Sequence, residues 1–186
     1  METKETIIEE IEALFTDNGE EEYFGEKVSQ YEHAVQAMQF AIDENQDIEM
    51  QIAGFLHDIG HMLQSTKAEE MDIYGRLDHE EAAANWLAER GFSLKIQVVI
   101  ENHVAAKKYL CFRNPEYFEK LSDASKKTLE FQGGIMVEEE ALAFETSPYF
   151  EESIMLRRWD DQAKIQDYKP MDLEYALSII RKYLNS

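Results

Sequence analysis

Apolar residues recur at helical spacing in the first third of the chain, and they predict two helices joined by a short polar turn. One face of the first helix carries Val28, Tyr31, Val35, Met38 and Ile42. His33 lies within this stretch, and the polar residues 44–47 follow it. The next apolar run, residues 52–56, ends in the doublet His57-Asp58. We therefore expect an antiparallel hairpin with one histidine on each arm.

The two histidines stand at matching distances from the expected turn. His33 lies 12 residues before Asn45, and His57 lies 10 residues after Asp47. At the rise of an α-helix, both rings then sit roughly 15 to 18 Å from the bend. The spacing therefore predicts that the two imidazoles face one another.

The same spacing returns further along the chain. Asp78-His79-Glu80-Glu81 is typical of a capped helix start, and residues 91–93 form the next expected turn. His79 lies 12 residues before Gly91, and His103 lies 10 residues after Ser93. A second hairpin is therefore expected to bring two more imidazoles to one level.

The His57-Asp58 doublet places a carboxylate in an apolar stretch, where a bare charge is costly unless a cation neutralises it. A lone histidine on a helix is more often a structural residue, but two hairpins with matched spacing favour a metal site. Asp58 is a candidate bridge between two adjacent metals, and Asp160 is a candidate to complete the first site. Imidazole together with carboxylate suits iron, manganese or zinc better than magnesium.

The composition favours one almost wholly helical domain. The chain has 186 residues, of which 44% are hydrophobic, so it can bury one sizeable core. It has only 3 prolines and 8 glycines, and few stretches of alternating β-branched residues. We therefore predict the all-α class.

Charge and cysteine content narrow the partners and the compartment. A formal charge of −21 disfavours binding to nucleic acid or to an anionic membrane surface. No apolar stretch approaches the roughly 20 residues of a membrane span. The single cysteine, Cys111, allows no intrachain disulfide, and a reducing cytoplasm fits it.

Two pairs of basic residues stand out against this acidic background. Lys107-Lys108 follows His103, and Arg157-Arg158 lies just before Asp160. Cations beside metal-ligand segments indicate a pocket for an anionic substrate. The alternative is that they pair with the abundant carboxylates.

These residues resemble the signature of a known family. His33, His57-Asp58 and Asp160 resemble the motif of the HD-domain superfamily, and His79 with His103 resembles its dinuclear branch. More narrowly, the chain is similar nearly end to end to the PhnZ-like mixed-valent di-iron oxygenases of phosphonate catabolism, which cleave the carbon–phosphorus bond of 1-hydroxyphosphonates. The matching blocks are Tyr23-Phe24-Gly25-Glu26, Glu32-His33-Ala34, Leu56-His57-Asp58-Ile59-Gly60-His61, His103-Val104-Ala105-Ala106-Lys107, residues 121–134 and Arg157-Arg158-Trp159-Asp160. The resemblance implies a helical bundle of one HD-type domain, 1–186, with an N-terminal helix at 1–19, a lid segment at 20–30 and a helical core at 31–186.

The resemblance also implies a role for each matching residue. One iron would be held by His33, His57, Asp58 and Asp160, and the other by Asp58, His79 and His103. The residues around the phosphonate would be His61, Lys107, Ser125, Thr128, Gln132 and Arg157. Tyr23 and Glu26 match the lid, and together with Asp58 and Lys107 they form the expected catalytic set. The implied cofactors are two iron ions in the mixed-valent Fe(II)/Fe(III) state, with dioxygen as cosubstrate. Apart from the resemblance, Ser125 and Thr128 would be helix caps and Gln132 part of a turn.

The resemblance leaves several substrates and functions open. Glu26 favours a cationic tail, so 2-amino-1-hydroxyethylphosphonate, which would yield glycine and phosphate, is the first candidate substrate. Hydroxymethylphosphonate, which would yield formate and phosphate, follows closely, and a trimethylammonium analogue is a third. An upstream hydroxylase would make such a substrate. Two other classes remain: a dinuclear HD phosphohydrolase that acts on a phosphate ester with the same six ligands, and a non-catalytic acidic helical module.

Overall fold

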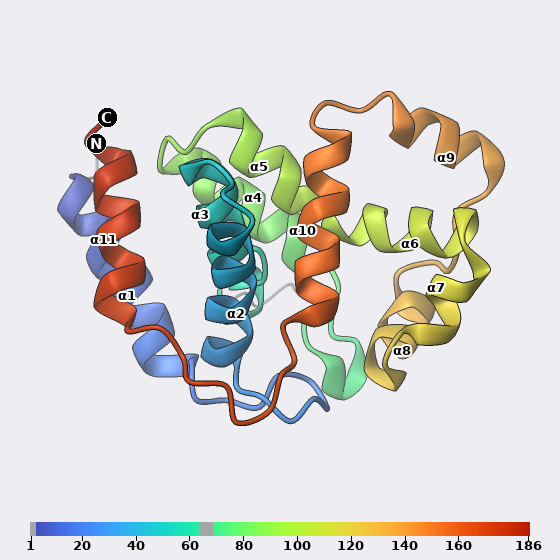
Figure 1. Ribbon diagram of the computed structural model, residues 1–186, viewed down its shortest axis with the longest axis horizontal. Helices are drawn as coiled ribbons and strands as arrows, with labels where there is room; N and C mark the ends of the chain where they lie inside the picture. Colours follow the sequence, from blue (N-terminus) through green and yellow to red (C-terminus); the bar gives the residue numbers. More distant parts are fainter. Residues whose placement is uncertain (1–2, 64–68) are drawn as a thin grey trace.

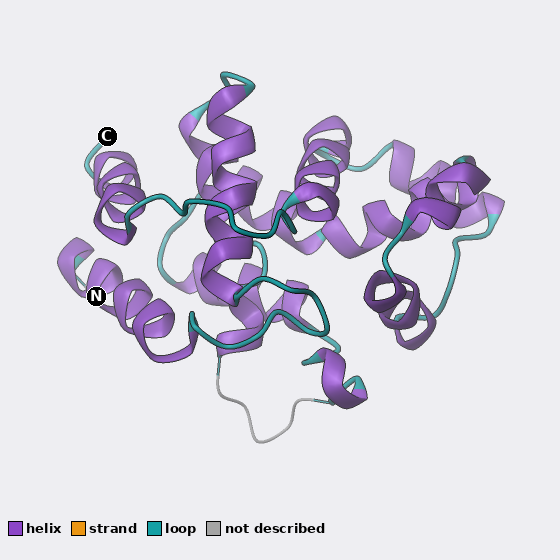
Figure 2. Ribbon diagram, turned by 60° about the horizontal axis from the view of Figure 1, so that its bottom comes forward, coloured by secondary structure: helices purple, strands orange, loops and turns teal. Residues whose placement is uncertain are grey.

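The computed structural model describes residues 3–63 and 69–186, and these residues form helices and connecting loops (Figure 2). Within them, the only extended pairings are two isolated bridges, Glu22 with Ser29 and Glu70 with Arg76. The predicted all-α class is confirmed. Residues 1 and 2 of the N-terminal helix expected at 1–19 lie outside the described residues.

The bounds of the helices are α1 (Lys4–Asn18), α2 (Gln30–Asp43), α3 (Ile48–Leu56), α4 (His79–Glu89), α5 (Leu94–Glu101), α6 (His103–Arg113), α7 (Pro115–Lys120), α8 (Asp123–Phe131), α9 (Glu138–Glu145), α10 (Phe150–Gln162) and α11 (Leu173–Leu184). Two short 3-10 helices, η1 (Ile59–Met62) and η2 (Asp72–Tyr74), lie between α3 and α4. Among the described helices, none combines the length and the hydropathy that a bilayer crossing requires.

Helices α2 and α3 form the first predicted hairpin, with the turn at the expected residues. α2 begins with a capping box, in which Ser29 and Glu32 each bind the other's backbone N–H. The two helices approach closely because Gly54 faces the backbone of α2. A Cβ at this position would lie 2.9 Å from the carbonyl oxygen of Ala37. The glycine therefore lets the two arms, with their histidines, come together.

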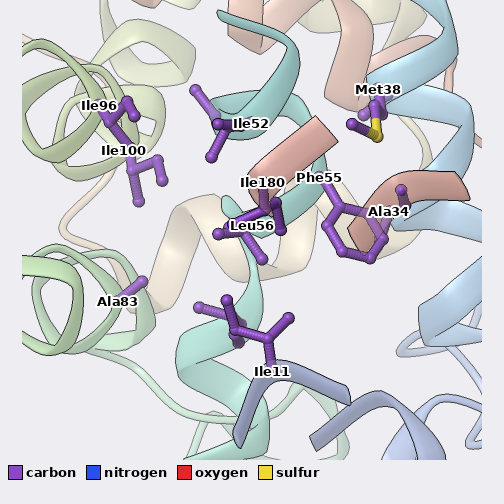
Figure 3. Packing of buried hydrophobic residues seen from close by; sticks show 14 of the residues in the cluster. Ile11, Ala34, Met38, Ile52, Phe55, Leu56, Ala83, Ile96, Ile100 and Ile180 are labelled. Carbon is purple, nitrogen blue, oxygen red and sulfur yellow. The ribbon is translucent and has the colours of Figure 1, made fainter. Parts of the chain in front are cut away.

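The main hydrophobic core surrounds this hairpin. Figure 3 shows Ile11 of α1, Phe55 and Leu56 of α3, Ile100 of α5 and Ile180 of α11 gathered in one cluster. All five side chains are at most 1% exposed. Full burial of a side chain of this size contributes about 1.5–3 kcal/mol, so this packing fixes the end of α3, where the doublet follows. Helices α1 and α11 lie side by side at one end of the molecule (Figure 1), and Lys4 at the start of α1 donates to Asn185 at the end of α11.

Helices α4 and α5 form the second predicted hairpin, and the start of α4 packs against η1. Asp78 precedes α4, but its side chain makes no capping bond, so the expected capped start is wrong in this detail. The carboxylate pairs instead with Arg76, whose forked guanidinium offers stronger, charge-assisted bonds than a backbone N–H. A Cβ on Gly60 would lie 1.9 Å from the carbonyl oxygen of His79. Only glycine therefore allows η1 to lie this close to the first residue of α4.

Helix α10 lies between the main core and a second group of helices, α6 to α9 (Figure 1). Ala106 of α6, Phe144 of α9 and Ile154 of α10 form a smaller buried cluster that holds this group together. The first residue of α6 is His103, and α10 carries Asp160 near its end. The two groups of helices therefore meet where the expected metal ligands lie.

Candidate metal centre

Six buried side chains from separate segments converge at one point in the structure. They are His33 from α2, His57 and Asp58 from the end of α3, His79 and His103 from the first residues of α4 and α6, and Asp160 from α10. Each is at most 7% exposed. The structure thus brings together all six residues expected as metal ligands. They form two groups that share Asp58 and could each hold a metal ion.

The first group consists of His33, His57, Asp58 and Asp160. The two Nε2 atoms of the histidines lie 3.0 Å apart. Asp58 Oδ2 lies 3.5 Å from His33 Nε2 and 3.4 Å from His57 Nε2, and Asp160 Oδ1 lies 3.4 and 3.9 Å from the same two atoms. Metal–ligand bonds of about 2.1 Å place neighbouring ligand atoms roughly 3.0 to 3.4 Å apart. The spacing therefore fits one metal ion at the centre of the group.

The second group consists of Asp58, His79 and His103. Its two Nε2 atoms lie 3.1 Å apart, and Asp58 Oδ1 lies 3.5 Å from His79 and 3.4 Å from His103. This carboxylate oxygen is buried, with no hydrogen-bond partner among the described residues. Asp58 therefore turns Oδ2 to the first group and Oδ1 to the second. An unpaired buried oxygen that faces two imidazole nitrogens is costly alone but suits a bridging metal ligand.

Backbone carbonyls fix the tautomer of the four imidazoles. The Nδ1 atom of each lies at most 3.0 Å from a carbonyl oxygen: His33 with Ala163, His57 with Gly54, His79 with Arg76 and His103 with Ile100. Because a carbonyl oxygen only accepts, Nδ1 carries the proton and Nε2 carries the lone pair. Two lone pairs then face one another in each group. They repel unless a proton or a metal ion lies between them.

The pKa values in the first group also favour a bound cation. Burial opposes protonation of His33, but its bonds to Asp160 and Asp58 outweigh burial and raise its pKa to about 9. Burial lowers the pKa of His57 to about 4. Burial would raise the pKa of the Asp58 and Asp160 carboxyls. The imidazoles beside Asp58, and Arg157 together with the imidazoles beside Asp160, nevertheless hold both pKa values well below the usual range. Two ionised carboxylates among imidazole lone pairs therefore favour a bound dication.

His61 has the opposite tautomer and a different task. Its Nδ1 accepts the backbone N–H of Arg76 at 3.1 Å, so Nε2 is the donor of the neutral ring. The ring stacks on His79, with the centroids 4.0 Å apart. Burial, followed by the neighbouring His79, holds the pKa of His61 well below its usual value. His61 therefore offers an N–H group to a ligand rather than a lone pair to a metal.

A small pocket opens onto these residues. Its lining includes all eight residues expected around the substrate: Tyr23, Glu26, His61, Lys107, Ser125, Thr128, Gln132 and Arg157. It also includes Phe24, Tyr74 and Lys164. The structure therefore places the expected substrate residues around one small cavity beside the metal groups.

One wall of this pocket is formed by α6 and α8. Lys107, which is 3% exposed, donates to Thr128 Oγ1 at 2.9 Å, and burial lowers the pKa of Lys107 to about 7. The hydroxyl of Ser122 accepts the N–H of Ser125, so the capping role considered for Ser125 belongs to Ser122. Gln132 has a buried Oε1 without a partner among the described residues. This wall therefore presents several polar groups to a bound anion.

Arg157 lines the pocket and also pairs with carboxylates, the alternative considered for the basic residues. Its Nη1 lies 2.6 Å from Asp160 Oδ2, its Nη2 pairs with Asp161, and its Nε donates to the hydroxyl of Tyr117 at 3.0 Å. By holding Oδ2 of Asp160, the guanidinium turns Oδ1 of the same carboxylate toward His33 and the first metal group. Arg157 therefore orients a metal-binding residue as well as lining the pocket.

Tyr23 covers the first metal group from the lid segment. Its hydroxyl donates to Asp58 Oδ2 at 2.7 Å, and its ring stacks on His33 with the centroids 3.8 Å apart. Burial, reinforced by Asp58, raises the pKa of Tyr23 well above its usual value. The ring of the next residue, Phe24, lies 4.4 Å from that of His61. The lid residues therefore close directly over the metal-binding side chains.

Glu26 meets a cation of the chain itself. Lys164 Nζ lies 2.9 Å from Glu26 Oε1, 3.1 Å from Ser125 Oγ and 3.3 Å from Ser122 Oγ. Lys164 was not among the residues expected in the site, although it stands four residues after Asp160, as Lys107 stands four residues after His103. This spacing from a metal-binding residue was the feature of the sequence that could have identified Lys164. Pairing across 138 residues is not visible in a local pattern.

Comparisons with known proteins agree with this geometry. The model of the HD domain family matches residues 30–133. An uncharacterized protein of Acanthamoeba polyphaga mimivirus is 37% identical over 173 residues, which cover 92% of this chain and 79% of that protein. The glycine-betaine-forming 1-hydroxy-2-(trimethylamino)ethylphosphonate dioxygenase of Leisingera caerulea is 37% identical over 179 residues, 96% of this chain and 91% of its own length. Hydroxymethylphosphonate dioxygenase of Gimesia maris is 39% identical over 162 residues, 87% of this chain and 80% of its own length.

Proposed function

The chain belongs to the HD-domain family, and we propose that it is an oxygenase that cleaves the carbon–phosphorus bond of a small 1-hydroxyphosphonate. Two relatives that match most of its length are named as dioxygenases of such phosphonates. The observation that carries the proposal is the position of Asp58, which turns one oxygen to each of two buried histidine pairs beside a pocket rich in donors. The products would be a carboxylate and phosphate.

We assign iron to both metal groups. Oxygen chemistry needs a metal that changes its oxidation state, and imidazole with carboxylate suits iron. Zinc has the same ligand preferences but no redox chemistry. The first group contains two carboxylates and the second only one, Asp58. The more anionic group favours Fe(III) and the other Fe(II), which supports a mixed-valent pair.

When bound, the metal pair would acidify the substrate's 1-hydroxyl and activate dioxygen. The residues of the chain bind and orient the phosphonate: His61 offers its Nε2–H, Lys107 its charge and Gln132 its amide. Tyr23, which donates to Asp58, lies over the metal groups from the lid side and excludes water. The pocket thereby holds C1 beside the metal ligands while the phosphonate stays in the polar wall.

The atoms and electrons of this reaction balance without a further reagent. The C1–P bond breaks, C1 is oxidised from an alcohol to a carboxylate, and dioxygen is fully reduced. The substrate and one dioxygen molecule supply every oxygen atom of the carboxylate and the phosphate. The 1-hydroxyl must already be present, so we also propose that a hydroxylase supplies the substrate. The single buried thiol, Cys111, fits our further proposal of a cytoplasmic setting.

The test is dioxygen-dependent release of phosphate from hydroxymethylphosphonate by protein purified with its iron. We expect phosphate and formate in equal amounts, with one dioxygen consumed for each, and no phosphate without air. Electron paramagnetic resonance should show a mixed-valent iron signal that the substrate perturbs. The Asp58→Asn variant should be inactive, whereas Asp17→Asn, on the exposed side of α1, should match the unchanged protein.

Two other outcomes would contradict this function. Release of phosphate from a phosphate ester, with no need for air, would identify a phosphohydrolase that uses the same six ligands. Protein that holds no metal and releases no phosphate from either kind of substrate would be a non-catalytic helical module.

A further inference from the structure

Lys164 is fixed in place by its own hydrogen bonds. An ammonium group has three N–H donors, and three oxygens surround this one: Glu26 Oε1, Ser122 Oγ and Ser125 Oγ. The side chains of Lys164 and Glu26 are only 15% and 16% exposed, so solvent screens their contact less than it screens a surface pair. The donors of Lys164 are therefore committed to the chain.

Glu26 is the acidic group of the pocket lining that does not belong to the metal groups. The other carboxylates of the lining are Asp58 and Asp160, which face the histidines. A cationic substituent on C1 would thus find its counter-charge at Glu26, as an ammonium next to a carboxylate. In the structure Lys164 already holds that position, so the pair as a whole is neutral.

Two aromatic rings also line the pocket. Phe24 and Tyr74 line it, and Gly75 beside them has a φ of +79°. A Cβ on Gly75 would lie 2.5 Å from the Phe24 ring. The Phe24 ring therefore packs directly against the backbone at Gly75.

Building on the proposed function, we infer that Lys164 sets the substrate specificity: it neutralises Glu26, so the pocket takes a 1-hydroxyphosphonate whose C1 substituent is uncharged. Hydroxymethylphosphonate, with only hydrogen in this place, fits this description. An ammonium tail would have to displace Lys164 from Glu26 and would leave a second cation in a partly buried site. Lys164 thereby reverses the preference that Glu26 alone would give.

The test compares substrate preference in four proteins: the unchanged chain, Lys164→Met, Glu26→Gln and the double variant. For each, kcat/KM in air is measured for hydroxymethylphosphonate, 2-amino-1-hydroxyethylphosphonate and the trimethylammonium analogue. The dissociation constants are measured without oxygen. The ratio between substrates is the readout, because it cancels any general loss from misplacing Ser125. Lys169→Met is the matched control, because Lys169 is an exposed lysine of the same loop.

The charges of the pair predict the pattern. The unchanged chain should prefer hydroxymethylphosphonate. Lys164→Met leaves Glu26 unpaired and should shift the ratio about tenfold toward the amino substrate, while Glu26→Gln leaves Lys164 unpaired and should shift it about tenfold the other way. The double variant is neutral again and should return to the original ratio, and Lys169→Met should not move it.

Failure of this inference differs from failure of the proposed function. If the unchanged chain prefers the amino substrate, or if the ratio is the same in the two single variants, Lys164 does not set specificity. Should Lys164→Met not fold, Glu26→Gln alone decides, because an unchanged ratio there contradicts the inference. If the unchanged chain releases no phosphate from any of the three substrates in air, it is the oxygenase function that fails.

Discussion

Replacing Arg157 with methionine should loosen the first metal site while leaving the second intact. The guanidinium contacts Asp160, Asp161 and the Tyr117 hydroxyl, and it is 3% exposed. Its bond to Asp160 Oδ2 fixes the rotation of the carboxylate that turns Oδ1 to His33. Methionine keeps much of the buried volume and removes all of these bonds. Asp160 then loses the bond that fixes its Oδ2 and one of its buried counter-charges.

The structure sets the size of the effect. Removing one partner of a buried ion pair costs about 3–5 kcal/mol, because the other charge stays buried. Part of that cost can be relieved by protonation of Asp160, which competes with metal binding. Loss of a residue that orients a metal ligand typically lowers affinity by 10- to 100-fold, which is about 1.4 to 2.7 kcal/mol. We therefore expect the metal affinity of the first site to fall by this factor, and that of the second site, formed by Asp58, His79 and His103, to change little.

The measurement is metal per chain by elemental analysis, as a chelator of known affinity is titrated into Arg157→Met and the unchanged protein. One of the two ions should leave at 10- to 100-fold lower chelator concentration in the variant. Arg158→Met is the matched control, because Arg158 is the next residue of α10 and is exposed. The reasoning is refuted if Arg157→Met holds both ions as tightly as the unchanged chain and only phosphonate binding weakens.

Three further changes test other parts of the site. Asp58→Asn should lose metal at both groups, since one residue faces both; two ions per chain by elemental analysis would contradict bridging. Gly60→Ala should destabilise the fold by about 1–3 kcal/mol and lower the melting temperature, because its Cβ would lie 1.9 Å from the carbonyl oxygen of His79; an unchanged melting curve would show that the contact relaxes freely. Burial lowers the pKa of Lys107 to about 7, so its charged form is present below this pH and lost above it. Binding of hydroxymethylphosphonate without oxygen should therefore weaken by up to tenfold per pH unit above 7, and Lys107→Met should lack this dependence; parallel pH profiles would exclude Lys107 as the charge that binds.

Helix geometry explains why the metal ligands could be predicted. The rise per residue is nearly constant, so equal counts from a turn place His33 opposite His57 and His79 opposite His103. The role of Arg157 was open to the same reasoning, because residues three and four apart share a helix face and Asp160 and Asp161 occupy those positions. The sequence left two interpretations of Arg157 open, a contact to the phosphonate and a pair with nearby carboxylates, and this spacing favours the pair.

The partner of Glu26 could not be predicted from residue spacing along a helix. Lys164 lies in a loop after α10, and no period links a loop residue to the lid segment near the other end of the chain. Contacts of α10, and of the loop after it, with α2 bring the two segments together. Glu26 taken alone indicates a preference for a cationic tail. The charge at this place in the pocket also depends on Lys164, which only the folded structure places beside Glu26.

The cations of the pocket, taken together, explain how a chain of charge −21 can hold a phosphonate dianion. Arg157 is committed to Asp160 and Asp161, and Lys164 to Glu26. Lys107 remains, but its pKa near 7 leaves it only partly charged at neutral pH. The metal ions must therefore supply most of the positive field that the phosphonate meets. The effect of one bound ligand on the affinity for another is reciprocal. Bound phosphonate should therefore raise the affinity for the metal ions by the same factor by which the metal ions raise the affinity for the phosphonate.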